Sequence, residues 1–84
     1  MKRDLLEIPG VGKQLKKGLL FLGYTDVDSL RGADPERMYQ RLCDSLHETV
    51  DRCVLYVYRE AVYYAEHEIH DPELLKWWNW KDEK

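Results

Sequence analysis

The stretch with the clearest chemistry is a glycine-rich turn near the amino terminus, Ile8-Pro9-Gly10-Val11-Gly12-Lys13. Gly10 and Gly12 let the backbone approach an anion because no Cβ stands in the way, and positive φ is open to them. A helix that begins after this turn presents unpartnered N–H groups at the positive end of its dipole, which favours phosphate. The sequence therefore predicts a phosphate-binding turn; a corner that binds nothing and a hairpin that docks a protein are the alternatives. The candidate phosphate site consists of Gly10, Val11, Gly12, Lys13, Lys16 and Lys17.

Metal binding has little support in the spacing of the cysteines and histidines. Cys43 and His47 lie four positions apart, and His67 and His70 lie three apart. Zinc sites usually combine Cys-x₂₋₄-Cys or His-x₃₋₅-His pairs into four ligands, and neither pair is present. We expect no metal. Cys43 and Cys53 fall in apolar helical patterns and are expected to be free, buried thiols.

Catalysis has no recognisable motif. Ser29 and Ser45 lack the sequence context of a nucleophile, and the two cysteines lack an electropositive setting that would lower a thiol pKa. We therefore expect no enzymatic activity, no cofactor and no small-molecule substrate.

Three tryptophans near the carboxyl end form a candidate protein interface. The alternative function is a protein-interaction module that docks through this Trp-rich end or through the central helix. On a helix, neighbouring residues diverge by about 100°, so the three rings cannot all cover one patch. At least one is expected to stay partly exposed, and tryptophan is enriched at interfaces. In the alternative, all three fold back over Tyr56, Tyr63 and Tyr64. The interface candidates are Trp77, Trp78 and Trp80.

The elements that carry these residues are all expected to be helices. Asp4, with Glu7 three positions later, resembles a capping box for a short helix that Pro9-Gly10 ends. A second helix runs from about residue 12 or 13 to Leu22 and stops at Gly23. Thr25 is expected to cap a third helix over residues 26–30.

Two acid-proline-acid triplets mark further helix starts. Asp34-Pro35-Glu36 and Asp71-Pro72-Glu73 each combine an N-cap residue, a proline at the first helical position and an early acid. The fourth helix should reach about Leu46, with Met38, Leu42, Cys43 and Leu46 on its apolar face. The last helix should extend through Trp78.

The central helix is expected over residues 50–67, opened by Thr49. Charged residues recur there every seven positions, at Arg52, Arg59 and Glu66. So wide an apolar sector is typical of a helix in the middle of a core. The apolar residues are Val50, Cys53, Val54, Val57, Ala61, Val62 and Ala65. The expected fold class is all-α, a compact domain of five to six helices.

Length and charge limit the number of domains and the surface that could meet nucleic acid. Eighty-four residues make one domain, with a hairpin over about residues 4–22, a helical core over 26–67 and a Trp-rich carboxyl-terminal helix over 71–80. Residues 1–25 carry a charge of +3, whereas residues 42–84 carry −5. Nucleic acid would therefore meet the amino-terminal quarter alone. The longest apolar run, Leu19–Leu22, is too short for a membrane span, and no export signal is present, so we expect a cytoplasmic protein.

Two resemblances add to this interpretation. Ile8–Gly12 matches the hydrophobic-Pro-Gly-hydrophobic-Gly turn of helix-hairpin-helix motifs. Nearly the whole chain resembles the bacterial "pathogenicity locus" family, small helix-hairpin-helix proteins sometimes labelled mitomycin-resistance proteins. The latter resemblance rests on Ile8–Lys13, on Asp34-Pro35-Glu36 with Tyr39 and Leu42-Cys43, on residues 50–57, and on residues 71–82.

The helix-hairpin-helix resemblance implies DNA binding without sequence preference, as in many repair and recombination proteins, and a link to DNA repair or damage resistance. With a single hairpin and an acidic remainder of the chain, this binding is expected to be weak. It places a DNA phosphate on the N–H groups of Gly10, Gly12 and Lys13. It also implies a site for a monovalent cation at the carbonyls of Leu6, Ile8 and Val11. Lys16 stands where such hairpins usually carry a small residue, which leaves two alternatives: its stem lies along the helix interface with the ammonium exposed, or the two helices pack differently.

Overall fold

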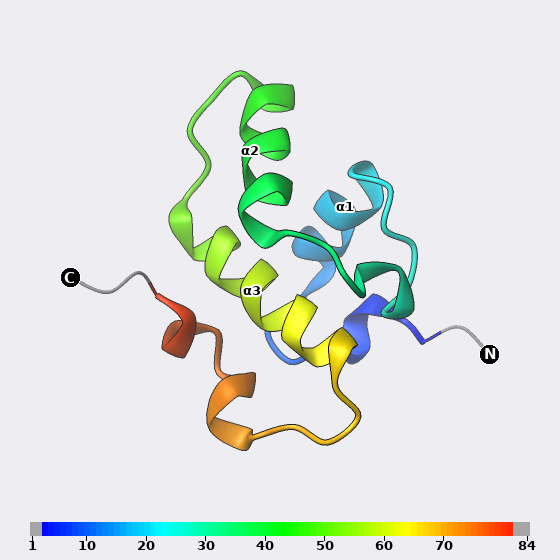
Figure 1. Ribbon diagram of the computed structural model, residues 1–84. Coiled ribbons are helices and arrows are strands. Elements are labelled where there is room, and N and C mark those ends of the chain that lie inside the picture. The colour runs from blue at the N-terminus through cyan, green and yellow to red at the C-terminus, as the bar shows by residue number, and fades with distance from the viewer. Residues whose placement is uncertain (1–2, 82–84) are drawn as a thin grey trace.

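Three α-helices and four short 3₁₀ turns build the computed structural model, which describes residues 3–81 (Figure 1). The α-helices are α1 (Lys13–Phe21), α2 (Pro35–Leu46) and α3 (Arg52–Glu66). The 3₁₀ turns are η1 (Leu5–Glu7), η2 (Asp28–Leu30), η3 (Pro72–Leu75) and η4 (Trp77–Trp80). No strand occurs over this range, so the all-α fold class is confirmed.

The expected number of helices, five to six, is wrong. The first, third and last of the expected helices each form only 3₁₀ turns of three or four residues. Pro9 ends the first segment, and Gly23 and Gly32 bound the third, so few residues remain for i→i+4 hydrogen bonds to propagate past the first turn. The segment expected as one helix over residues 71–80 is also divided, because Lys76 is extended, with ψ 114°, between η3 and η4.

Helix α3 occupies the middle of the molecule. Figure 1 shows α2 and α1 to one side of it and the carboxyl-terminal turns η3 and η4 to the other. Its expected core residues Val57, Ala61, Val62 and Ala65 are buried. Val50, Cys53 and Val54 are only half-buried. The residues of α3 that are buried without having been expected are Leu55, Tyr58 and Glu60.

Helix α2 begins as its sequence predicts. The Asp34 carboxylate accepts a hydrogen bond from the Glu36 N–H at 3.0 Å, and Pro35 fills the first helical position. Met38 and Leu42 are buried as expected, but Leu46 is 49% exposed and Tyr39 is buried instead. The helix ends at Leu46, since His47 adopts a left-handed conformation with φ 54°, so this last side chain projects beyond the core.

Two of the expected caps are wrong. Asp51, not Thr49, caps α3 by accepting the Cys53 N–H at 2.9 Å. Thr25 does not cap η2; instead Asp26 accepts the Ser29 N–H at 2.9 Å and Ser29 Oγ donates to the Asp26 carbonyl at 2.6 Å. In both places a nearby aspartate, whose carboxylate reaches a free N–H, replaces the threonine.

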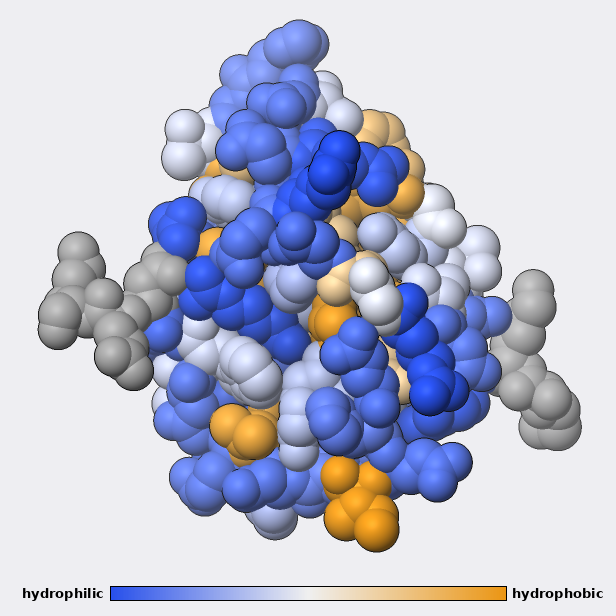
Figure 2. Space-filling view, viewed as in Figure 1, coloured by the Kyte–Doolittle hydropathy of each residue, from blue (hydrophilic) through white to orange (hydrophobic). Residues whose placement is uncertain are grey.

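The face of the molecule drawn in Figure 2 is mainly polar. Hydrophilic side chains dominate the face in Figure 2, and the apolar ones form separate spots rather than one continuous patch. Among the described residues, no helix is long and apolar enough to cross a membrane.

Candidate functional site

The glycine-rich turn joins η1 to α1. Gly10 has φ +87°, a conformation that favours glycine, as expected. The Val11 N–H donates to the Ile8 carbonyl at 3.1 Å and closes the turn. Gly12 is the N-cap of α1 and is extended, with φ −96° and ψ −172°, so positive φ is needed at Gly10 but not at Gly12.

The outer side of this turn is open. Gly10, Gly12 and Lys13 are exposed, and no atom outside the neighbouring residues lies within 4 Å of the position that a Cβ on Gly12 would take. The first N–H groups of α1 have no carbonyl within the helix to bond. Val11 has a different role, because its side chain is buried and its N–H is already bonded.

The three lysines of α1 are not equivalent. Lys13 and Lys17 are exposed, and neither forms an ion pair within residues 3–81. The Lys16 ammonium contacts both carboxylate oxygens of Asp4, at 3.1 and 3.3 Å. Asp4 also accepts the Leu6 N–H at 2.8 Å, and these two contacts lower its pKa, the backbone bond most. Lys16 therefore ties α1 to the cap of η1, and its charge is paired with that of Asp4.

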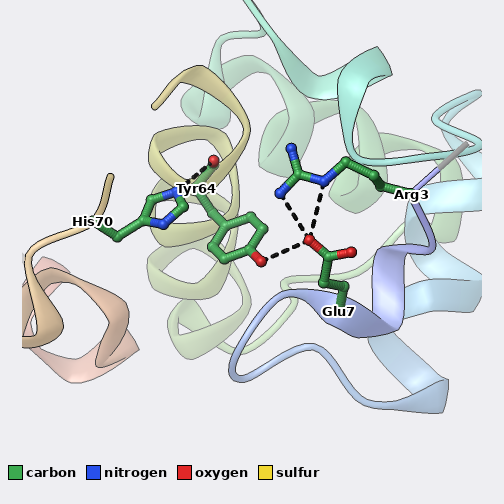
Figure 3. A network of polar contacts seen from close by, with 4 residues as sticks. All are labelled: Arg3, Glu7, Tyr64 and His70. Carbon is green, nitrogen blue, oxygen red and sulfur yellow. Dashed lines mark hydrogen bonds and ion pairs between the residues drawn. The ribbon is translucent and has the colours of Figure 1, made fainter. Parts of the chain in front are cut away.

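A second polar network anchors η1 to α3 (Figure 3). One Glu7 oxygen accepts hydrogen bonds from Arg3, at 2.7 and 3.0 Å, and from the Tyr64 hydroxyl at 2.7 Å. These bonds, Arg3 first, lower the pKa of Glu7. On its other side Tyr64 stacks on His70, with ring centroids 4.3 Å apart. Glu7 is thus used in a tertiary contact, and Arg3 does not offer a free charge beside the turn.

Glu60 lies beneath the turn and was not expected to take part in the site. It is fully buried, and neither carboxyl oxygen has a hydrogen-bond partner among the described residues. Its Oε1 is 3.0 Å from the position that a Cβ on Gly10 would take. Burial raises the pKa of Glu60 to about 8. A signal was present in the sequence, because Glu60 lies three positions after Val57 and next to Ala61, within the apolar sector of the central helix.

The carbonyls implied for a monovalent cation belong to Leu6, Ile8 and Val11. The Ile8 carbonyl already accepts the Val11 N–H, so a cation would have to share that oxygen. The cation site remains a prediction.

The three tryptophans differ in their surroundings. Trp77 is half-buried against the core, and its Cδ1 lies 3.5 Å from the Cβ position of Gly10. The Trp80 indole donates to the Leu74 carbonyl at 2.8 Å, and its ring lies 5.6 Å from that of Tyr63. Trp78 is 49% exposed and packs edge-on against Trp77. Of the three candidate interface residues, Trp78 therefore offers the most surface to a partner.

Both cysteines are free and half-buried rather than fully buried. Burial is the main cause that raises the pKa of the Cys53 thiol, which makes it less reactive. No cluster of three or more metal-binding side chains was found in the described part of the chain.

Comparison with known proteins yields one family and one curated relative. Residues 2–84 match the profile of the family described as "Pathogenicity locus". A protein of Streptomyces lavendulae named "Mitomycin resistance protein McrB" is 28% identical over 81 residues, which is 96% of this chain and 73% of that protein. No solved structure matches the chain.

Proposed function

The chain belongs to the Pathogenicity locus family, and from this premise we propose that it binds the DNA backbone weakly and without sequence preference. The proposed contact is the turn Ile8–Lys13, acting as a helix-hairpin-helix motif. The observation that carries the proposal is the open start of α1, where Gly12 has no side chain and no atom outside the neighbouring residues lies within 4 Å of its Cβ position, beside the exposed Lys13. One relative is named for mitomycin resistance, and we extend the proposal to a role in damage resistance. The proposed function includes no catalysis.

The charge available for this contact is small. Asp4 holds Lys16, and Glu7 holds Arg3, so Lys13 and Lys17 supply most of the attraction. A protein that neutralises about two phosphates should show a slope of log K against log salt near −2, since each phosphate contributes about 0.9. The dissociation constant should fall in the non-specific range, about 10⁻⁴–10⁻⁵ M.

A salt series of duplex titrations tests this function. Fluorescence anisotropy with a short labelled duplex should give the shallow slope, and Lys13→Gln should reduce it by about 0.9. Lys17→Gln should reduce it less, because Lys17 lies one helical turn farther from the free N–H groups. Arg37→Gln, which removes an exposed positive charge from α2, should leave the slope unchanged.

Nuclear magnetic resonance of the protein, titrated with the same duplex, locates the contact through shifts of the backbone amide signals. The largest shifts should fall within residues 8–17. Absence of shifts at low salt, or shifts centred elsewhere, would refute DNA binding by this turn.

The exposure of Trp78 supports a second candidate, docking of a partner protein at the carboxyl-terminal end. Apolar docking would persist at high salt, where phosphate binding is lost. Trp78→Ala should weaken a protein complex and leave duplex binding unchanged, so this variant separates the two functions.

A further inference from the structure

Glu60 is the anomalous side chain of this fold. It is 0% exposed, and both of its carboxyl oxygens lack a hydrogen-bond partner among residues 3–81. An ionised carboxylate without a partner is very costly in such a place, so the side chain stays neutral by holding its proton. Burial raises the pKa of Glu60 to about 8, and no neighbouring charge contributes to this change.

The carboxyl group lies at the meeting point of three separate segments. Its Oε1 is 3.0 Å from the Cβ position of Gly10 in the turn, and Trp77 of η4 approaches the same position to 3.5 Å. Only the missing side chain of Gly10 leaves room for the carboxyl group. A movement of the carboxyl group toward the turn therefore meets the backbone of Gly10.

The charged groups on the surrounding elements are committed elsewhere or exposed. On the amino-terminal side, Asp4 is paired with Lys16, and Glu7 with Arg3 and Tyr64. On the carboxyl-terminal side, Lys76 is paired with Glu73. Lys13, Lys17, Asp28, Arg31 and Arg37 are exposed. On α2, Arg41 bonds the Leu22 carbonyl and Asp44 bonds Gln40. On α3, Arg52 lies over the Tyr39 ring, Arg59 bonds Glu36 and Trp80, Glu66 bonds Gly32, and the buried Tyr58 hydroxyl has no hydrogen-bond partner among the described residues. None of them neutralises Glu60 when it ionises.

We propose that Glu60 is a proton-dependent control on the glycine turn: the neutral acid supports the turn beneath Gly10, and ionisation weakens the binding of phosphate there. The control of binding rests on the proposed function, whereas the coupling of Glu60 to Gly10 does not. A carboxylate that remains beneath the turn repels phosphate. A carboxylate that moves out to water displaces Gly10 and disturbs the N–H groups that follow it. Both responses lower affinity as the pH rises.

The coupling is tested without DNA. In protein carrying ¹³C in glutamate and glycine, the Glu60 Cδ and Gly10 Cα signals are followed from about pH 6 to about pH 9. These carbon signals can be followed at high pH, where fast exchange of amide protons with water would weaken amide signals. Both should share one transition near pH 8, which is lost in Glu60→Gln. Glu66→Gln removes an exposed carboxylate from the same helix and should leave the transition in place.

Three outcomes of this titration would overturn the proposal. In the first, Glu60 titrates near its ordinary value. In the second, Gly10 does not respond when Glu60 does. In the third, exchange of potassium chloride for choline chloride shifts or abolishes the transition, which would mean that a metal cation rather than a proton neutralises the carboxyl group.

Duplex anisotropy at constant ionic strength tests the effect on binding. If only the neutral acid binds, affinity should fall about tenfold between pH 6.5 and one pH unit above the pKa of Glu60. The fall should persist in Glu66→Gln and be nearly absent in Glu60→Gln. Equal losses in all three proteins would refute control by Glu60 while leaving DNA binding intact. Absence of binding at pH 6.5 and low salt would instead refute the proposed function, and with it the control of binding.

Discussion

At the scale of single residues, the two turn glycines have different physical roles. Gly10 adopts φ +87° and leaves room for the Glu60 carboxyl group, so both its backbone and its missing side chain matter. Gly12 is extended and faces open space. A side chain at Gly12 would therefore disturb a ligand rather than the fold.

This difference predicts that two matched substitutions affect different properties, one the stability of the fold and the other the binding of duplex DNA. Gly10→Ala should reduce the free energy of unfolding by about 1–2 kcal/mol or more, because alanine resists positive φ and its Cβ meets Glu60. Gly12→Ala should change stability by less than about 0.5 kcal/mol but weaken duplex binding. Urea denaturation and anisotropy measure the two properties. Equal stability of the two variants would contradict the geometry of the turn.

Asp4 limits the charge of the proposed site, because it holds the Lys16 ammonium. Asp4→Asn should keep the cap on the Leu6 N–H, since asparagine caps as well as aspartate does. The variant frees Lys16, so duplex affinity at low salt should rise about threefold and the salt slope should steepen by up to about 0.9. Asp44→Asn makes the same change of charge at the end of α2. A similar gain in that control would show that net charge alone, and not Lys16, is responsible.

At the scale of elements, the carboxyl-terminal segment is part of the fold. Asp71 caps η3 through the Glu73 N–H at 2.9 Å, and Arg59 of α3 donates to the Trp80 carbonyl at 2.7 Å. Trp77 packs on the core beside the turn. Short 3₁₀ turns have little stability of their own, so α3 must hold this segment in place and is covered by it in return.

Truncation after His70 should therefore remove the cooperative thermal transition. The loss uncovers the apolar face of α3, and a dye that binds exposed apolar surface should bind the truncated chain. Circular dichroism at far- and near-ultraviolet wavelengths measures the change. A truncated chain that melts cooperatively near the temperature of the full chain would show that the segment is dispensable.

Single substitutions provide the control for that truncation. Trp77→Ala should cost about 2–3 kcal/mol, whereas Trp78→Ala, at a half-exposed position, should cost about 1 kcal/mol or less. Similar losses in the free energy of unfolding for both variants would contradict the half-exposed position of Trp78.

At the scale of the whole molecule, buried and exposed acids make stability depend on pH in opposite directions. Asp4, Glu7 and Asp51 have lowered pKa values, Asp4 and Asp51 mainly through backbone hydrogen bonds and Glu7 mainly through Arg3. Their contribution is present above their ordinary pKa values and is lost only in acid. Glu60 has a raised pKa, so its contribution is greatest in acid and is lost as the pH rises toward 8.

The free energy of unfolding should thus fall between about pH 5 and pH 8. The ordinary pKa of the carboxyl group is 4.5 and the folded value is about 8. A tenfold change in proton affinity is worth about 1.4 kcal/mol, so the fall should be on the order of a few kcal/mol. Glu60→Gln should flatten the curve. Urea denaturation at several pH values provides the measurement, and a flat curve for the unmodified protein would contradict the burial of Glu60.

Local features of this protein could be predicted from the sequence because their causes lie within a few residues. Asp34 and Asp71 cap the segments that follow them, and a proline occupies the first position after each. The glycine turn, the start of α1 and the all-α fold class follow from the same short-range rules. The number of helices could not be predicted in this way, since start and stop signals do not reveal whether a segment forms an α-helix or a single 3₁₀ turn.

Tertiary structure alone decided which groups meet across the chain. Asp4 and Lys16 are separated by 12 positions, and Glu7 and Tyr64 by 57, yet both pairs are within hydrogen-bond distance. The surroundings of Glu60 come from the turn, α3 and η4 together. Burial and pairing depend on how distant segments pack, and a change in that packing alters the charge of a carboxyl group without altering its sequence neighbours. For this reason, the sequence could locate the glycine turn, but only the packed structure revealed the acid beneath it.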